Sequence, residues 1–124
     1  MIPSEFKKRL SSFKYAGRGI QEMFRNHANF KLQLFFACLA FIFGLIFKIS
    51  QVEWITLLLC IGGVLSLETI NSSIEYLVDL VSPDFHPTAG KIKDLAAAAV
   101  LIFSFISLII GFAIFIPYFF EYAF

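Results

Sequence analysis

The fifteen residues from Ser66 to Leu80, SLETINSSIEYLVDL, decide how the rest of the chain must fold. They follow WITLLLCIGGVL (residues 54–65), an uncharged apolar run that is typical of a membrane interior. On a helix turning 100° per residue, the acidic and amide side chains of this segment fall within an arc of about 80°: Glu68, Asn71, Glu75 and Asp79. A carboxylate in hydrocarbon costs at least several kcal/mol unless it is paired, protonated or facing water. Such a stripe therefore indicates a functional site.

The composition of the whole chain indicates an all-α integral membrane protein. The chain has 124 residues, of which 59% are hydrophobic and only 15% are charged, and 17 are Phe. The hydrophobic fraction is higher, and the charged fraction lower, than in a typical soluble domain. A single domain over 1–124 uses the whole length, so no soluble catalytic domain is expected. The formal net charge of +1 is too small to neutralise a run of phosphates, so we expect no nucleic-acid partner.

Three stretches are long and apolar enough to cross a membrane. Sixteen uncharged residues separate Lys31 from Lys48, and they span about 24 Å as a helix. We predict membrane-spanning helices over 30–48, 52–81 and 95–120, with Pro117 ending the regular part of the last one. The segment SPDFHPTAGKIKD (residues 82–94) contains two prolines and a glycine and is predicted to form a loop.

The first 29 residues have the pattern of an amphipathic helix. Apolar residues recur on one side while basic and polar residues occupy the other faces; the apolar ones are Phe6, Leu10, Phe13, Ile20 and Phe24. A helix of this kind lies in the membrane interface, where its Lys and Arg side chains attract anionic lipid headgroups. Packing of the same helix on the protein's own membrane bundle is an equally good interpretation.

The distribution of Lys and Arg predicts the orientation in the membrane. Seven of the ten precede the first span, two lie in the second loop, and only Lys48 lies in the first loop. Cytoplasmic segments carry the excess of Lys and Arg. We therefore expect the amino terminus and the second loop in the cytoplasm, and the carboxyl terminus outside.

The stripe connects the depth of the membrane with cytosolic water. Counted from Trp54 at the outer interface, Glu68 lies about 21 Å into a hydrocarbon core about 30 Å thick, and Asp79 lies about 16 Å further on. A carboxylate at lipid depth can take a proton from a lipid hydroxyl, and carboxylates at the wet end can hold a divalent cation. Lys93 adds a charge for phosphate. Asp94 fits the same site or, equally well, an N-cap of the third span.

Two other classes of protein fit some of these residues. The stripe also suits polar contacts between helices of an oligomer, although three acids on one face repel one another unless cations or protons intervene. Acids on a membrane helix also mark ion pathways, which indicates a proton-coupled transporter or channel subunit. Against a transporter, the third span carries only Ser104 and Ser107 as polar side chains.

Four segments resemble the prokaryotic diacylglycerol kinase family, which includes undecaprenol kinases: SFKYAGRGI, KISQVEW, LSLETINSSIEYLVDL and FHPTAGKIKDLAAAAVLI. The resemblance covers almost the whole chain. It implies a homotrimer in the bacterial cytoplasmic membrane, with sites shared between neighbouring subunits. It also implies ATP-dependent phosphorylation of a membrane lipid alcohol, with Mg²⁺ accompanying ATP. The segment KISQVEW and the His-Pro pair of the second loop favour undecaprenol as the acceptor over diacylglycerol.

The resemblance also assigns roles to individual residues. By that similarity Glu68 is the general base, and Glu75 is a ligand of the magnesium ion. The positions that match nucleotide contacts and other polar parts of the same site are Lys8 or Arg9, Tyr15, Asn71, Asp79, Asp84, Phe85, His86, Lys93 and Asp94.

His27 departs from the family pattern. Many members have a Glu at this position as a second carboxylate ligand of the metal, whereas this chain reads RNHANF over residues 25–30. Imidazole binds magnesium poorly compared with carboxylate. Either His27 itself contacts the metal or the nucleotide phosphate, or Glu22, about one turn earlier, contributes the contact instead.

Overall fold

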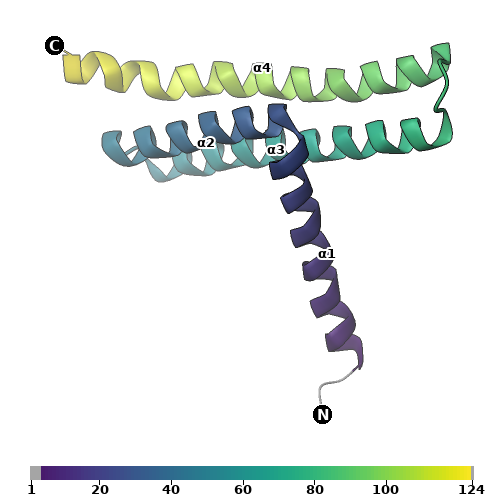
Figure 1. Ribbon diagram of the computed structural model, residues 1–124. Coiled ribbons are helices and arrows are strands. Elements are labelled where there is room, and N and C mark those ends of the chain that lie inside the picture. Colours follow the sequence, from purple (N-terminus) through teal and green to yellow (C-terminus); the bar gives the residue numbers. More distant parts are fainter. Residues whose placement is uncertain (1–3, 124) are drawn as a thin grey trace.

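Four helices make up residues 4–123, the part of the chain that the computed structural model describes (Figure 1). They are α1 (Ser4–Asn26), α2 (Ala28–Phe47), α3 (Gln51–Val81) and α4 (Pro87–Ala123). The helices α2, α3 and α4 run alongside one another, whereas α1 leaves this bundle at a steep angle (Figure 1). Since α2, α3 and α4 are each long and apolar enough to cross a membrane, the expected all-helical fold with three spans is confirmed.

The bundle has two unequal ends. As helices of 31 and 37 residues, α3 and α4 are about 46 and 55 Å long, more than a hydrocarbon core of about 30 Å requires. At 20 residues, α2 is shorter, so the last turns of α3 and the first turns of α4 continue beyond it (Figure 1). The polar stripe of α3 begins beside the first turns of α2, where Gln33 donates to Glu68, and continues into this extending part.

Local sequence signals set the tight connection between α2 and α3. Lys48 ends α2 in the left-handed conformation, with φ 53° and ψ 49°, and its backbone N–H donates to Gly44 O. Ser50 then caps α3: its hydroxyl accepts from Glu53 N at 3.3 Å, and the Glu53 carboxylate accepts from Ser50 N at 2.7 Å. This reciprocal capping box satisfies two backbone donors that the first turn leaves free.

The predicted loop between the second and third spans is too long, because α4 begins at Pro87 rather than at residue 95. Pro suits the first position of a helix, where the missing N–H has no intrahelical partner anyway. His86 stands just before it, and its Nδ1 accepts from Thr88 N at 3.1 Å. The N-cap interpretation of Asp94 is therefore wrong, since Asp94 lies two turns inside the helix. Pro117 does not end α4 either: the helix continues to Ala123 although an interior proline removes one backbone hydrogen bond.

Close packing between helices depends on two glycines. The Phe103 ring of α4 fills the place where a Cβ on Gly63 would be, only 2.2 Å from its Cε1 atom. The Trp54 ring lies similarly against Gly44, 2.7 Å from the position of a Cβ there. The buried core that joins the three long helices consists of Phe47, Ile49, Leu57 and Ile114. Most other apolar side chains of these helices are exposed, which fits contact with lipid or with further subunits.

Candidate functional site

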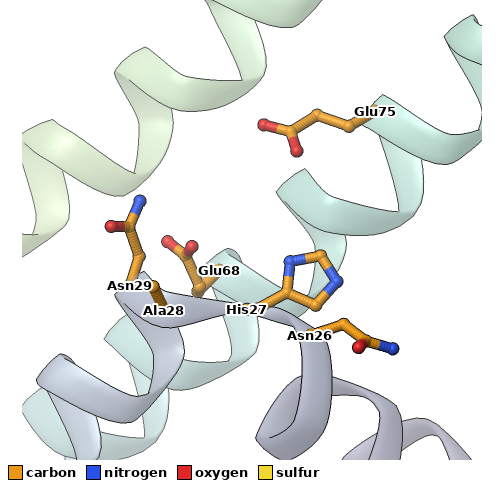
Figure 2. Close-up of a pocket in the computed structure, with 6 residues that line it drawn as sticks. All are labelled: Asn26, His27, Ala28, Asn29, Glu68 and Glu75. Carbon is orange, nitrogen blue, oxygen red and sulfur yellow. The ribbon is translucent and has the colours of Figure 1, made fainter.

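A pocket lies where the end of α1 and the start of α2 meet α3, and the two acids nearest the membrane interior line it (Figure 2). Its lining residues are Asn26, His27, Ala28, Asn29, Glu68 and Glu75. Figure 2 shows the carboxyl groups of Glu68 and Glu75 facing the same space, with the Asn29 amide beside Glu68. Two residues of the predicted helical stripe, Glu68 and Glu75, thus line a pocket, whereas Asn71 and Asp79 do not.

Glu68 is buried, with only 4% of its surface exposed. Gln33 of α2 donates from Nε2 to Glu68 Oε2 at 2.9 Å. The other atom of that amide, Gln33 Oε1, is buried and has no hydrogen-bond partner within residues 4–123. A buried carbonyl oxygen without a partner costs about 1–3 kcal/mol, so this side chain offers an acceptor that a substrate hydroxyl can satisfy.

Glu75 lies two turns along α3 from Glu68 and is oriented by Asn71. Asn71 Nδ2 donates to Glu75 Oε1 at 3.0 Å. Asn71 is itself buried, and its Oδ1 has no hydrogen-bond partner among the described residues. The pair therefore presents oxygen atoms on the side of Glu68 nearer the carboxyl end of α3, and oxygen atoms are the ligands that Mg²⁺ prefers.

His27 interrupts the helices at the edge of the pocket. It has an extended backbone, with φ −114° and ψ 104°, between α1 and α2. Its Nδ1 lies 3.1 Å from Ser72 Oγ, and its Nε2 lies 2.9 Å from the Tyr76 hydroxyl. Both ring nitrogens are therefore occupied by residues of α3.

Glu22 joins the same cluster from the last turns of α1. Its Oε1 accepts from the Tyr76 hydroxyl at 3.0 Å and from Asn26 Nδ2 at 2.7 Å. These two hydrogen bonds, the one from Asn26 first, hold the pKa of the Glu22 carboxyl below its usual range.

The remaining residues predicted at the cytosolic end fall into two groups. Asp79 and Lys93 form an ion pair that joins α3 to α4. Asp84 and Phe85 lie exposed in the connection between these helices, and His86 is used as the cap of α4. Asp94 is exposed on the second turn of α4. These side chains line the same end of the bundle as the pocket but do not close it.

The structure does not bring the predicted contacts of α1 to the pocket. Lys8, Arg9 and Tyr15 are exposed on the amino-terminal part of α1, which points away from the bundle (Figure 1). Within one chain, they therefore lie apart from Glu68 and Glu75.

Gln33, Tyr76, Asn29 and Asn26 are site residues that sequence reasoning missed. Gln33 and Glu68 are 35 positions apart, and Tyr76 and His27 are 49 apart, so no local spacing relates them. The one signal available was Gln33 itself, a lone amide in an apolar run that a membrane helix does not need.

Metal binding at this site depends on few protein ligands. Across residues 4–123, no three side chains of the His, Cys, Asp and Glu types form a ready-made metal site. Mg²⁺ usually takes one or two carboxylates and completes its shell with water and substrate phosphates. The Glu75 carboxylate beside the free Asn71 Oδ1 fits that requirement, whereas His27 has no free nitrogen.

Apolar spanning helices, with the buried carboxylate of Glu68 and the half-buried one of Glu75 lining a pocket, define a multi-pass membrane protein with a polar site. Residues 14–115 match the model of the family described as prokaryotic diacylglycerol kinase. The chain belongs to this family and is a membrane lipid kinase, which supports the kinase interpretation over a transporter or channel subunit.

The relatives include two kinds of lipid kinase. The chain is 44% identical over 114 residues to the undecaprenol kinase of Bacillus subtilis, covering 92% of this chain and 93% of the relative. It is 34% identical over 98 residues to the diacylglycerol kinase of Helicobacter pylori, covering 78% and 76%. The diacylglycerol kinase of Escherichia coli is 27% identical over 97 residues, covering 78% and 80%.

Proposed function

We propose that this protein transfers the terminal phosphoryl group of ATP to the hydroxyl of a membrane lipid alcohol, with undecaprenol as the first candidate and diacylglycerol as the second. The observation that carries the proposal is the buried Glu68, held by an amide and facing a pocket beside Glu75. Undecaprenol comes first because the similarity to an undecaprenol kinase extends over nearly the full length of both chains.

Glu68 acts as the general base in this proposal. A carboxylate within hydrogen-bond reach of a lipid hydroxyl can take its proton as the hydroxyl attacks phosphorus. Gln33 holds one oxygen of the carboxylate at 2.9 Å, so the other can accept the proton of the lipid hydroxyl. As the lipid oxygen forms its bond to the terminal phosphorus of ATP, the hydroxyl proton passes to Glu68. The bond between that phosphorus and the oxygen of the departing ADP breaks.

Glu75 is the proposed magnesium ligand, oriented by its hydrogen bond from Asn71. Bound Mg²⁺ would neutralise charge on the transferring phosphoryl group. The Asn29 amide lines the same pocket and would hold water or phosphate around the ion. Both nitrogens of His27 are already hydrogen-bonded, so we propose no phosphate contact for it, whereas Glu22 offers its second carboxylate oxygen.

The nucleotide would bind at the end of the bundle where α3 and α4 continue beyond α2. Lys93, paired with Asp79, supplies a positive charge there, and Asp84, Phe85, His86 and Asp94 surround the same connection. Lys8, Arg9 and Tyr15 point away from the pocket of their own chain, which supports a site completed by a neighbouring subunit. A homotrimer with shared sites meets this requirement, with α1 lying in the membrane interface.

This end of the bundle would face the cytoplasm of a bacterial cell, where ATP is available. The nine-to-one excess of Lys and Arg on that side supports this orientation.

The decisive experiment uses the purified protein in detergent or lipid with labelled ATP, and presents undecaprenol and diacylglycerol in parallel. Glu68→Gln should abolish lipid phosphorylation without unfolding the protein, because the amide cannot accept the proton. Glu121→Gln, at the opposite end of the bundle, is the matched control and should retain full activity. Substantial turnover by Glu68→Gln would refute the role of Glu68 as base.

A further inference from the structure

A chain of hydrogen bonds links α3 to the break between α1 and α2 and to α1. It runs from Ser72 to His27, from His27 to Tyr76 and from Tyr76 to Glu22, with separations of 3.1, 2.9 and 3.0 Å. Two of these residues belong to α3, one to α1, and His27 to the break itself. We call this set of four residues the α1 latch.

The donors and acceptors of the α1 latch can be assigned so that no member is left unsatisfied. Tyr76 donates its only hydroxyl hydrogen to Glu22, so its oxygen must accept from His27 Nε2–H. A neutral imidazole with hydrogen on Nε2 has an acceptor at Nδ1, which suits the Ser72 hydroxyl. Every member is thereby satisfied, and His27 is left with no free lone pair.

Metal binding through His27 would break this assignment. Coordination through Nδ1 would displace the hydroxyl of Ser72, which is 2% exposed and would remain buried without that partner. Coordination through Nε2 would displace the Tyr76 hydroxyl. Either loss leaves a polar group unsatisfied, and imidazole is in any case a poor ligand for magnesium.

The α1 latch is placed where it controls the direction of α1. His27 occupies the N-cap of α2 but makes no capping hydrogen bond with its side chain, so its ring is free for contacts with α3. The His27 and Tyr76 rings also meet edge to face, with centroids 5.4 Å apart. Apolar contact continues across the break, where Met23 is buried and the Phe24 and Phe30 rings lie 5.5 Å apart.

We infer that the α1 latch fixes α1 against α3 at the rim of the pocket, and that His27 is a positioning residue rather than a metal ligand. Tyr76 is the centre of the latch, because its hydroxyl both accepts from His27 and donates to Glu22. The consequence for catalysis rests on the proposed function, in which α1 carries nucleotide contacts. The positioning of α1 by the latch does not depend on that function.

The first test measures the mobility of α1 directly. A nitroxide label on a cysteine at Gly19, after replacement of both native cysteines, reports on α1, and a side chain there meets no atom within 4 Å. Tyr76→Phe and Ser72→Ala should both increase the mobility of the label. Tyr122→Phe, at the other end of the bundle, and Ser73→Ala, whose hydroxyl bonds back to Thr69 O of its own helix, are the matched controls and should not. Unchanged label mobility in Tyr76→Phe would overturn the inference.

Conservative substitution gives a second measurement that does not risk unfolding. In Glu22→Gln the amide oxygen can still accept from Tyr76, so the label should stay as immobile as in the wild type. Glu22→Leu removes the acceptor and should release α1. If any substitution of Glu22 loosened α1 regardless of the hydrogen bond, the mobility of the label would rise equally in both variants. That result would count against the α1 latch.

Metal affinity separates positioning from ligation, whether or not the protein proves to be a kinase of either lipid. Mn²⁺ replaces Mg²⁺ as a paramagnetic probe, titrated in the presence of a non-hydrolysable ATP analogue. The inference predicts that His27→Ala mobilises α1 and leaves Mn²⁺ affinity within about twofold of wild type. In kinase assays, Tyr76→Phe should raise the apparent KM for ATP about fivefold, the effect of about one net hydrogen bond, at an unchanged magnesium requirement. A loss of Mn²⁺ affinity of about tenfold or more in His27→Ala, without mobilisation of α1, would make His27 a metal ligand instead.

Discussion

A single methyl group at Gly63 tests how closely α3 and α4 pack beneath the site. Gly63→Ala would place a Cβ 2.2 and 2.3 Å from two ring carbons of Phe103, far inside van der Waals contact. The ring is rigid, so the whole Phe103 side chain or the α4 backbone must move. Overpacking of this kind costs about 1–3 kcal/mol.

Gly62 supplies the matched control one position earlier. A Cβ at Gly62 meets no atom within 4 Å, so Gly62→Ala adds the same methyl group to the same helix without a collision. Both substitutions also share the gain in helix propensity, up to about 1 kcal/mol relative to Gly. Their difference in the free energy of unfolding therefore isolates the contact with Phe103, and we expect it to be about 1–3 kcal/mol.

The free energy of unfolding can be measured by titrating SDS into the protein in mild detergent and following helix content by circular dichroism. Gly63→Ala should unfold at a lower SDS fraction than Gly62→Ala, and the double variant Gly63→Ala/Phe103→Leu should recover part of the loss. Equal stability of the two alanine variants would refute the packing argument.

Three further predictions concern metal binding, topology and pH. Glu75→Gln should raise the magnesium concentration needed for half-maximal activity, since an amide is a weaker ligand than a carboxylate, and a magnesium titration at fixed ATP decides it. With both native cysteines replaced, Thr88→Cys should resist impermeant thiol reagents in intact cells, because the Lys and Arg count puts this end of the bundle inside; labelling from outside would reverse the orientation. The folded-state pKa of Glu22 lies below its ordinary value of 4.5, so the support of its charged form is present above that value and is lost as the pH falls through the lowered pKa. The free energy of unfolding should accordingly fall more in acid in the wild type than in Glu22→Gln, and identical acid responses of the two proteins would exclude Glu22 as the cause.

The parts of the fold that follow from the sequence are those set by local periodicity. Runs without charge set the three spans, because a membrane admits few charged side chains in any neighbouring arrangement. The helical spacing of Glu68 and Glu75 predicts one polar face, and the structure opens that face onto a pocket. The sequence prediction and the structure differ at the start of α4, where Pro83, Pro87 and Gly90 predict a loop. At the first position of a helix the missing N–H of proline costs no hydrogen bond. The residue type that commonly marks the end of a helix can therefore also begin one, as Pro87 does for α4.

The roles of His27 and Gln33 required the folded chain, and the reason is physical. Spacing along a helix relates residues three or four positions apart, whereas these side chains meet partners on α3 at separations of 35 to 49 positions. From the sequence, His27 stands alone as a weak substitute for a carboxylate. In the structure it satisfies both a buried serine and a tyrosine that is already tied to α1. Replacing a carboxylate by an imidazole here changes the chemistry from attracting a cation to joining two helices, because an imidazole can donate and accept on opposite sides of one ring while a carboxylate only accepts. A chain that makes this change needs a hydrogen-bonding partner on each side, and Ser72 and Tyr76, one turn apart on α3, provide them.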